Sequence, residues 1–165
     1  MEFSKIISKC ILQIRKESPF FASLILFAPI IESQSIDTAA TDGRNILINN
    51  KFFSSLKSSE QNAVMLHEVL HLALLHVFRM NSRNPEVWNI AADIVVNDLI
   101  DLNTSFKLPK EAIRDKSFRK KSVEYVYEQL IKNKTRLKLY NLHNPDLLSN
   151  KIDVNQTKQV DENEQ

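Results

Sequence analysis

The stretch VMLHEVLHLALLH, Val64–His76, places three histidines and a glutamate inside a strongly apolar run. Within it, His67, Glu68 and His71 form the pattern H-E-x-x-H. On a helix, His67 and His71 lie one turn apart on the same face, so that both imidazoles can reach one zinc ion. Glu68 falls beside the metal, where its carboxylate can take a proton from a zinc-bound water. The stretch therefore predicts a helix that carries a metal site.

The apolar neighbours of the motif argue against a solvated polar face. Leu66, Val69, Leu70 and Leu72 leave no polar stripe around the histidines. Burial of two imidazoles and a carboxylate costs several kcal/mol unless something compensates these groups. A bound cation supplies that compensation.

His76 is a tempting third ligand, but helical geometry argues against it. It follows His67 by nine residues, which is about half a turn around a continuous helix. The segment LALLHV contains no helix breaker, so we expect the helix to continue. We therefore expect His76 to be a packed or capping histidine.

The next predicted helix, PEVWNIAADIVVNDLIDL, has a narrow polar stripe on an otherwise apolar surface. The stripe either faces solvent or faces a buried metal. Asp93 lies at its centre and follows His71 by 22 residues, which leaves room for the chain to turn back. We predict Asp93 as the third ligand, with Glu86 as the runner-up and Asn97 as a hydrogen-bonding partner of a ligand. The residues of the stripe are Glu86, Asn89, Asp93, Asn97 and Asp101.

A metal site at which water attacks a carbonyl group also needs a group that stabilises the oxyanion. Arg79 is one candidate, and Tyr125 and Tyr127 are others. Arg79 is alternatively a surface cation near a helix end, where it suits the helix dipole.

Other segments indicate a mixed fold. Met1–Lys16 has helical periodicity, and Ser18 with Pro19 begins either a short helix or a buried strand. Ser35–Ala40 and Arg44–Ile48 flank the turn TDGR, whose Gly43 is the single glycine of the chain. Asp-Gly is a strong hairpin signal, so we expect a β-sheet of two or three strands.

The end of the chain differs in composition. Asn84 and Ser122 are predicted helix caps, the second for a helix over SVEYVYEQLIKN. From about residue 134 the sequence becomes polar. We therefore predict one domain over residues 1–133 and a disordered tail or linker over 134–165.

Composition excludes several functions. The net charge of +2 is small and the basic residues are scattered, so we expect no nucleic-acid partner, and action on protein–DNA adducts is disfavoured. The longest apolar run, residues 20–31, is too short for a membrane span. Cys10 is the single cysteine, which fits a buried residue of a cytoplasmic protein.

The segments TAATDGRNILINNKFF, HEVLHLALLHVFR and WNIAADIVVNDLI together resemble a metallopeptidase domain family of bacterial proteins. The resemblance covers roughly residues 18–132. In that family the domain often precedes a von Willebrand factor A-like domain.

The resemblance implies a zincin-like α+β fold, mostly helical, with a small sheet beside the H-E-x-x-H helix. It also implies zinc on His67 and His71, Glu68 as catalytic base and Asp93 as the downstream acid. The implied partners are a peptide or protein substrate and a MoxR-type AAA ATPase or a von Willebrand factor A-like protein.

We therefore predict zinc-dependent hydrolysis of peptide bonds, with Arg44–Ile48 as the edge strand that pairs with the substrate. The alternative is an inactive, zinc-stabilised scaffold associated with an AAA ATPase.

Overall fold

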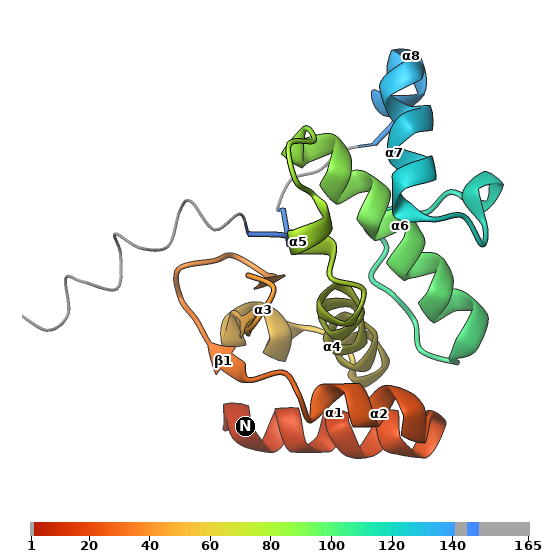
Figure 1. Cartoon of the computed structure of the whole chain (residues 1–165). Helices are drawn as coiled ribbons and strands as arrows, with labels where there is room; N and C mark the ends of the chain where they lie inside the picture. Colours follow the sequence, from red (N-terminus) through yellow and green to blue (C-terminus); the bar gives the residue numbers. More distant parts are fainter. Residues whose placement is uncertain (1, 141–144, 149–165) are drawn as a thin grey trace, which may run out of the picture.

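The computed structural model describes residues 2–140 and 145–148. The chain has a mostly helical α+β fold with one three-stranded sheet, as predicted (Figure 1). The helices are α1 Phe3–Glu17, α2 Pro19–Ile25, α3 Asn50–Ser55, α4 Ser58–Ala73, α5 His76–Arg79, α6 Pro85–Asn103, η1 Lys116–Phe118 (a 3-10 helix), α7 Val123–Lys132 and α8 Lys134–Leu137.

Helix α4 is the central element of the fold. Every residue from position 62 to position 71 is buried, including the histidines and glutamate of the motif. On one side α4 packs against α1, α2 and strand β2 (Ala39–Thr41), and on another side it packs against α6. The apolar residues of the motif helix belong to one core cluster with α1, α2, the sheet and the later part of α6, and a second cluster joins α5, α6 and α7.

The sheet has the order β1-β3-β2, with β1 at Ile30–Glu32 and β3 at Ile46–Ile48. β2 and β3 form the predicted antiparallel hairpin, while β1 pairs with β3 in parallel. Gly43 has a φ of 90°, and a Cβ there would lie 2.9 Å from the Phe78 ring, so both backbone and space require glycine. The expectation of an edge strand at Arg44–Ile48 is wrong, because β3 lies in the middle of the sheet and β2 lies at its edge.

The predicted helix starts are confirmed by their hydrogen bonds. The side chains of Ser18, Asn84 and Ser122 each accept from a backbone N–H three residues later, at 3.4, 3.0 and 3.2 Å. Ser18 and Pro19 thus begin helix α2, which decides between the two alternatives for this segment.

The expectation that the motif helix continues through His76 is wrong. α4 ends at Ala73, Leu75 adopts a left-handed conformation with a φ of 57°, and α5 begins at His76. A left-handed residue other than glycine costs about 1–2 kcal/mol. Two carbonyl groups at this break accept hydrogen bonds from side chains. Arg79 donates to Leu74 O at 2.9 Å, and Trp88 donates to His76 O at 2.8 Å.

Part of the predicted tail is described and makes contacts. Residues 134–137 form α8, and Leu147 forms a β-bridge with Thr41 of β2. Residues 149–165 of that tail lie outside the described residues.

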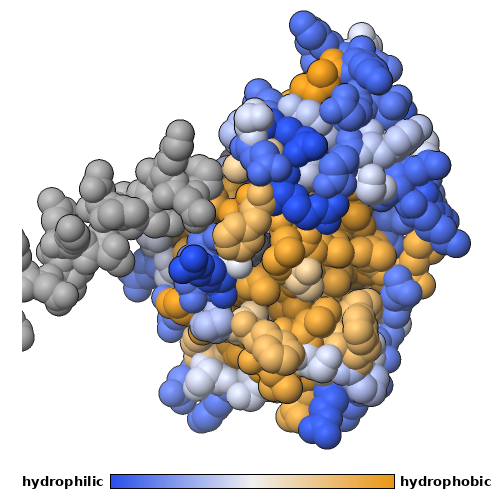
Figure 2. Space-filling view, in the orientation of Figure 1, coloured by the Kyte–Doolittle hydropathy of each residue, from blue (hydrophilic) through white to orange (hydrophobic). Residues whose placement is uncertain are grey.

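One face of the described part carries a broad patch of apolar residues (Figure 2). Seen from the side drawn in Figure 1, they gather over α4, between α6 and the pair formed by α1 and α2 (Figure 2). None of the described helices combines the length and the apolar character that a membrane span needs.

Candidate metal centre

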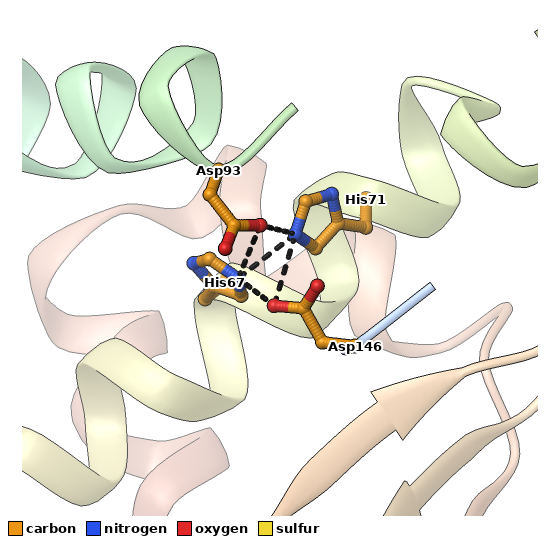
Figure 3. Close-up of side chains that lie close together, drawn as sticks. All are labelled: His67, His71, Asp93 and Asp146. Carbon is orange, nitrogen blue, oxygen red and sulfur yellow. Dashed lines mark hydrogen bonds and ion pairs between the residues drawn. The ribbon is translucent and has the colours of Figure 1, made fainter. Parts of the chain in front are cut away.

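Four buried side chains converge between α4, α6 and the segment 145–148. His67 and His71 come from α4, Asp93 comes from α6, and Asp146 comes from the segment near the end of the described chain (Figure 3). Each offers one donor atom, and the four atoms lie within 4.8 Å of one another. The helical turn between the two histidines therefore places them as the sequence predicts, and Asp93 joins them.

The separations of these atoms fit a small tetrahedral cation. His67 Nε2 lies 2.8 Å from His71 Nε2 and 2.6 Å from Asp146 Oδ2. Asp93 Oδ1 lies 3.2 Å from His71 Nε2 and 3.7 Å from His67 Nε2. Four ligands at zinc distances of 2.0–2.1 Å on a tetrahedron are about 3.3 Å apart, which is close to these values. The donor set fits a metal ion of this size.

His67 is oriented through its other ring nitrogen. Its Nδ1 lies 2.7 Å from Asn97 Oδ1, and the Asn97 amide group donates in turn to Ile113 O at 2.8 Å. Because the amide nitrogen of Asn97 is used in this way, its oxygen faces His67 and accepts a hydrogen bond from the Nδ1–H group. Nε2 is then left unprotonated toward the centre, as a metal ligand requires.

His71 is oriented in a similar way by His76. The two Nδ1 atoms lie 2.9 Å apart, and His76 Nε2 has no hydrogen-bond partner among the described residues. Burial, and next the charge of His71, lower the pKa of His76 to about 2, so His76 stays neutral and its Nδ1 can accept a hydrogen bond from the Nδ1–H of His71. His76 lies outside the group of donor atoms, as expected, but it contacts a member of that group.

Asp146 is held by Asn89 of α6. The Asn89 amide group donates to Asp146 Oδ1 at 2.6 Å, and its oxygen accepts from the backbone N–H groups of Asp146 and Leu147 at 3.1 Å each. The same amide group donates to Asp93 Oδ1 at 3.2 Å. One asparagine of the polar stripe thus fixes both carboxylates.

Glu68 lies beside the four donor atoms and is not one of them. Its side chain is buried, and its Oε2 has no hydrogen-bond partner among the described residues. Glu68, His67, Asp93 and Asp146 line a cavity of about 370 Å³. The other walls of the cavity are mostly apolar and include Phe52, Val64, Leu108 and Ile113.

The pKa values of the side chains at the centre are shifted because these groups are buried and several carboxyl groups lie close together. Burial, and next the charge of Asp146, raise the pKa of Glu68 to about 8 and that of Asp93 to about 6. Burial lowers the pKa of His71, but the neighbouring carboxylates outweigh this effect and raise it to about 10. Without a cation the centre therefore retains protons, and a divalent ion at the donor atoms would replace them.

Four of the residues singled out from the sequence lie elsewhere. Glu86 is exposed on the first turn of α6 and is outside the group of donor atoms. Arg79 pairs with Glu124 of α7 at 2.7 Å and does not line the cavity. Tyr127 accepts a hydrogen bond from the backbone of Asn84, and Tyr125 is exposed.

Asp146 is the residue that the sequence analysis missed. It lies in the region read as a polar tail, where composition alone indicated no contact. The signal that could have found it is local, because Pro145 and the pair Leu147 and Leu148 interrupt the polar composition around this acid. Leu147 is buried, as expected for an apolar residue that docks.

The arrangement can be compared with known proteins. A protein of Thermotoga maritima described only as an uncharacterised protein is 26% identical over 121 residues, which cover 68% of this chain and 30% of the relative. The chain thus spans about 30% of that relative's length. No solved structure matches the chain. A family described as "Putative metallopeptidase domain" matches residues 2–162, nearly the whole chain, including both histidines, Glu68, Asp93 and Asp146. The chain belongs to this metallopeptidase domain family.

Proposed function

We propose that the protein is a zinc-dependent metallopeptidase that hydrolyses peptide bonds. One observation carries the proposal: two histidines and an aspartate converge beside a buried glutamate, and the glutamate opens onto a cavity. A site that only stabilises a fold has no use for an unpaired acid at a cavity wall, because such an acid costs free energy when buried.

Zinc is the ion that fits this donor set best. Imidazole nitrogens and carboxylate oxygens at tetrahedral separations are typical zinc ligands. His67, His71 and Asp93 would hold the ion, with Asn97 and His76 fixing the two imidazoles. When bound, zinc supplies a Lewis acid that polarises a carbonyl oxygen and makes water a stronger nucleophile at neutral pH.

Glu68 is the proposed general base. Its side chain lines the cavity into which water and a peptide can enter, and its Oε2 has no hydrogen-bond partner among the described residues. From there the carboxylate accepts a proton from the attacking water and later delivers one to the leaving amine. Among the acids in the described part of the chain, Glu68 alone has a fully buried side-chain oxygen without a hydrogen-bond partner.

The cavity and the sheet edge suggest how a peptide binds. The apolar walls formed by Phe52, Val64, Leu108 and Ile113 suit a large apolar side chain of the substrate. β2 lies at the edge of the sheet and contributes Ala39 to the cavity wall, so an extended peptide can pair with it. We propose that β2, in place of the predicted β3 segment, is the substrate-binding strand.

The decisive experiment compares Glu68→Gln with the wild type after loading with one zinc ion per chain. We expect the variant to retain zinc and to lose at least 100-fold in hydrolysis of a mixed peptide library, because only the proton acceptor is removed. Glu86→Gln is the matched control, since Glu86 is exposed and away from the centre. Full activity of Glu68→Gln would refute the proposed mechanism.

The ligand set is tested separately by metal analysis. We expect Asp93→Ala to lose zinc and Glu86→Ala to keep it. The reverse result would show that the third ligand has been assigned to the wrong acid.

The second candidate function is a zinc-stabilised scaffold without activity. The observation that favours it is Asp146, which gives the ion a fourth protein donor, as in structural zinc sites. In this case a MoxR-type ATPase or a von Willebrand factor A-like protein would be the partner, and the chain would fold with zinc but hydrolyse no peptide. Purified zinc-loaded protein that fails to cleave any library peptide, while chelation unfolds it, would favour the scaffold.

A further inference from the structure

The segment 145–148 pairs with the edge of β2 through one isolated β-bridge. The backbone N–H of Thr41 donates to Asp146 O at 2.7 Å, and Thr41 O accepts from the N–H of Leu148 at 2.9 Å. Thr41 and Leu147 form a parallel β-bridge. The segment thus uses the same main-chain groups that an extended peptide would use on this edge.

The segment also fills the last coordination position. His67, His71 and Asp93 leave one position of a tetrahedral ion for water, as in catalytic sites. Asp146 Oδ2 lies 2.6 Å from His67 Nε2 and 3.5 Å from His71 Nε2, so it stands where that fourth ligand belongs. With Asp146 in place, a tetrahedral zinc ion has no position for water.

The recognition of the segment depends mainly on its backbone. Asn89 accepts from the N–H groups of Asp146 and Leu147, and Thr41 makes the two bonds on the other side. The side chains that contribute are the Asp146 carboxylate and the buried Leu147. A separate peptide with an acidic residue followed by an apolar one can form the same contacts.

The cavity beside the metal centre suggests that the site does more than hold an ion with four protein ligands. Glu68 remains unpaired beside the closed centre, and the cavity that it lines is also lined by Asp146. Departure of the segment would open one wall of this cavity and one position on the ion together.

We propose that residues 145–148 are a built-in competitor for the peptide site, which binds extended segments with an acidic residue directed at the metal. Docking of this segment and binding of a substrate peptide exclude each other. This inference rests on the proposed function, since it assigns the regulation of the same site.

The first test uses the full chain with Co²⁺ in place of zinc, and acetohydroxamate as a probe for an open metal position. The visible spectrum of Co²⁺ reports both occupancy and the entry of the probe. We expect Asp146→Ala to bind one Co²⁺ per chain and to bind acetohydroxamate at least tenfold more tightly than the wild type. Asp101→Ala is the matched control, because Asp101 is on α6 and pairs with Arg114 instead. Loss of Co²⁺ from Asp146→Ala, or unchanged probe affinity, would overturn the proposal.

A second pair of variants tests docking without altering any donor atom. Leu148→Pro removes the N–H that donates to Thr41 O, and Leu148→Ala retains it. We expect the proline variant to bind acetohydroxamate at least threefold more tightly than the alanine variant. Equal affinities would show that docking on β2 does not control access to the metal.

A third test restores the segment in trans. The blocked tetrapeptide Pro-Asp-Leu-Leu, which has the sequence of residues 145–148, is added to Co²⁺-loaded Asp146→Ala protein. We expect it to displace acetohydroxamate, and we expect the matched peptide Pro-Asn-Leu-Leu to require at least a tenfold higher concentration. Failure of both peptides to compete would overturn the proposal.

None of these readouts depends on turnover. If the segment behaves as expected but no peptide is cleaved by the zinc-loaded Asp146→Ala variant, the peptide site stands and the proposed hydrolysis fails. If cleavage by the wild type is as fast as cleavage by Asp146→Ala, hydrolysis stands and the competitor role fails.

Discussion

Two polar clusters hold the later part of the chain to the rest of the molecule, and they differ in charge balance. In the surface cluster, the Asp115 carboxylate accepts from Arg136, Tyr140 and Ser117, so that one acid meets one guanidinium. In the metal centre, Asp93 and Asp146 meet imidazoles and Asn89, and no Lys or Arg among the described residues donates to them. The surface cluster is complete by itself, whereas the metal centre has acids that only protons or a cation can balance.

This difference separates a structural ion pair from a candidate metal site. Burial of a carboxylate costs free energy unless a positive charge offsets the loss of solvation. At the metal centre no Lys or Arg among the described residues supplies that charge. The contrast predicts that removing a metal donor has a large effect that depends on the ion, and that removing Asp115 has a smaller effect that does not.

The largest effect is expected for His71→Ala. The substitution removes a donor atom and leaves His76 without its partner at 2.9 Å. We expect zinc binding to be lost and the free energy of unfolding in the presence of zinc to fall by about 3–5 kcal/mol. Denaturant unfolding with and without a chelator measures this. The chelator should destabilise the wild type and leave His71→Ala unchanged, and equal destabilisation of both would contradict the comparison.

A smaller effect on the same centre is expected for Asn97→Ala. The variant leaves the donor atoms in place but removes the acceptor that orients His67 at 2.7 Å. Loss of such a partner typically weakens metal binding by about 10–100-fold. Competition with a chromophoric chelator measures the zinc affinity. Asn103→Ala is the matched control on the same helix, since Asn103 is exposed and bonds only to Leu99 O, and an equal loss in both variants would remove the special role of Asn97.

The centre also shows how far the sequence could predict the site. The spacing of His67, His71 and Glu68 follows from helical geometry, and Asp93 follows from the polar stripe on an otherwise apolar helix. These inferences need only local periodicity and the cost of burying polar groups. The hairpin and the three helix caps could be predicted for the same reason, because each depends on residues close together in the chain.

What could not be predicted depends on distant contacts. Asp146 is 79 residues from His67, and its place follows from backbone bonds to Thr41 and Asn89 that no periodicity encodes. The break after α4 was missed because Leu75 is an ordinary helix former, and the side chains of Trp88 and Arg79 bond to the carbonyl groups of the residues on either side of it. The polar composition of the final region indicated no structure, although residues 145–148 dock with Leu147 buried.

A moderate effect, with a distinct pH dependence, is expected for Asp115→Asn. Burial raises the pKa of the Asp115 carboxyl, but hydrogen bonds from Ser117, Tyr140 and Arg136 outweigh it and hold the pKa well below its usual range. A depressed carboxyl pKa stabilises the fold above the pKa of the unfolded chain, near 4, and this contribution is lost as pH falls through the lower folded value. We expect the variant to be less stable by about 1–2 kcal/mol at pH 7.

The pH series distinguishes this cluster from the metal centre. The stability gap between wild type and Asp115→Asn should narrow as the pH falls below about 4, because the unfolded wild-type chain then binds a proton that the folded carboxyl binds only at a lower pH. A chelator should not change the gap at pH 7. A gap that depends on the chelator would mean that the two clusters are coupled, and the comparison would fail.

The smallest effect is expected for Asp101→Ala, which tests the same polar stripe at its exposed end. Asp101 pairs with Arg114 at 2.8 Å, and about a third of each side chain is exposed, at 32% and 36%. Such a pair contributes about 0.5 kcal/mol or less, and salt screens it. We expect a small loss of stability at low ionic strength that disappears in about 1 M salt, the concentration at which the screening length falls to about 3 Å. Zinc content should be unchanged, because the stripe changes character between Asn97, which is 1% exposed, and Asp101. A loss of zinc in this variant would show that the metal centre extends one helical turn beyond Asn97 on α6.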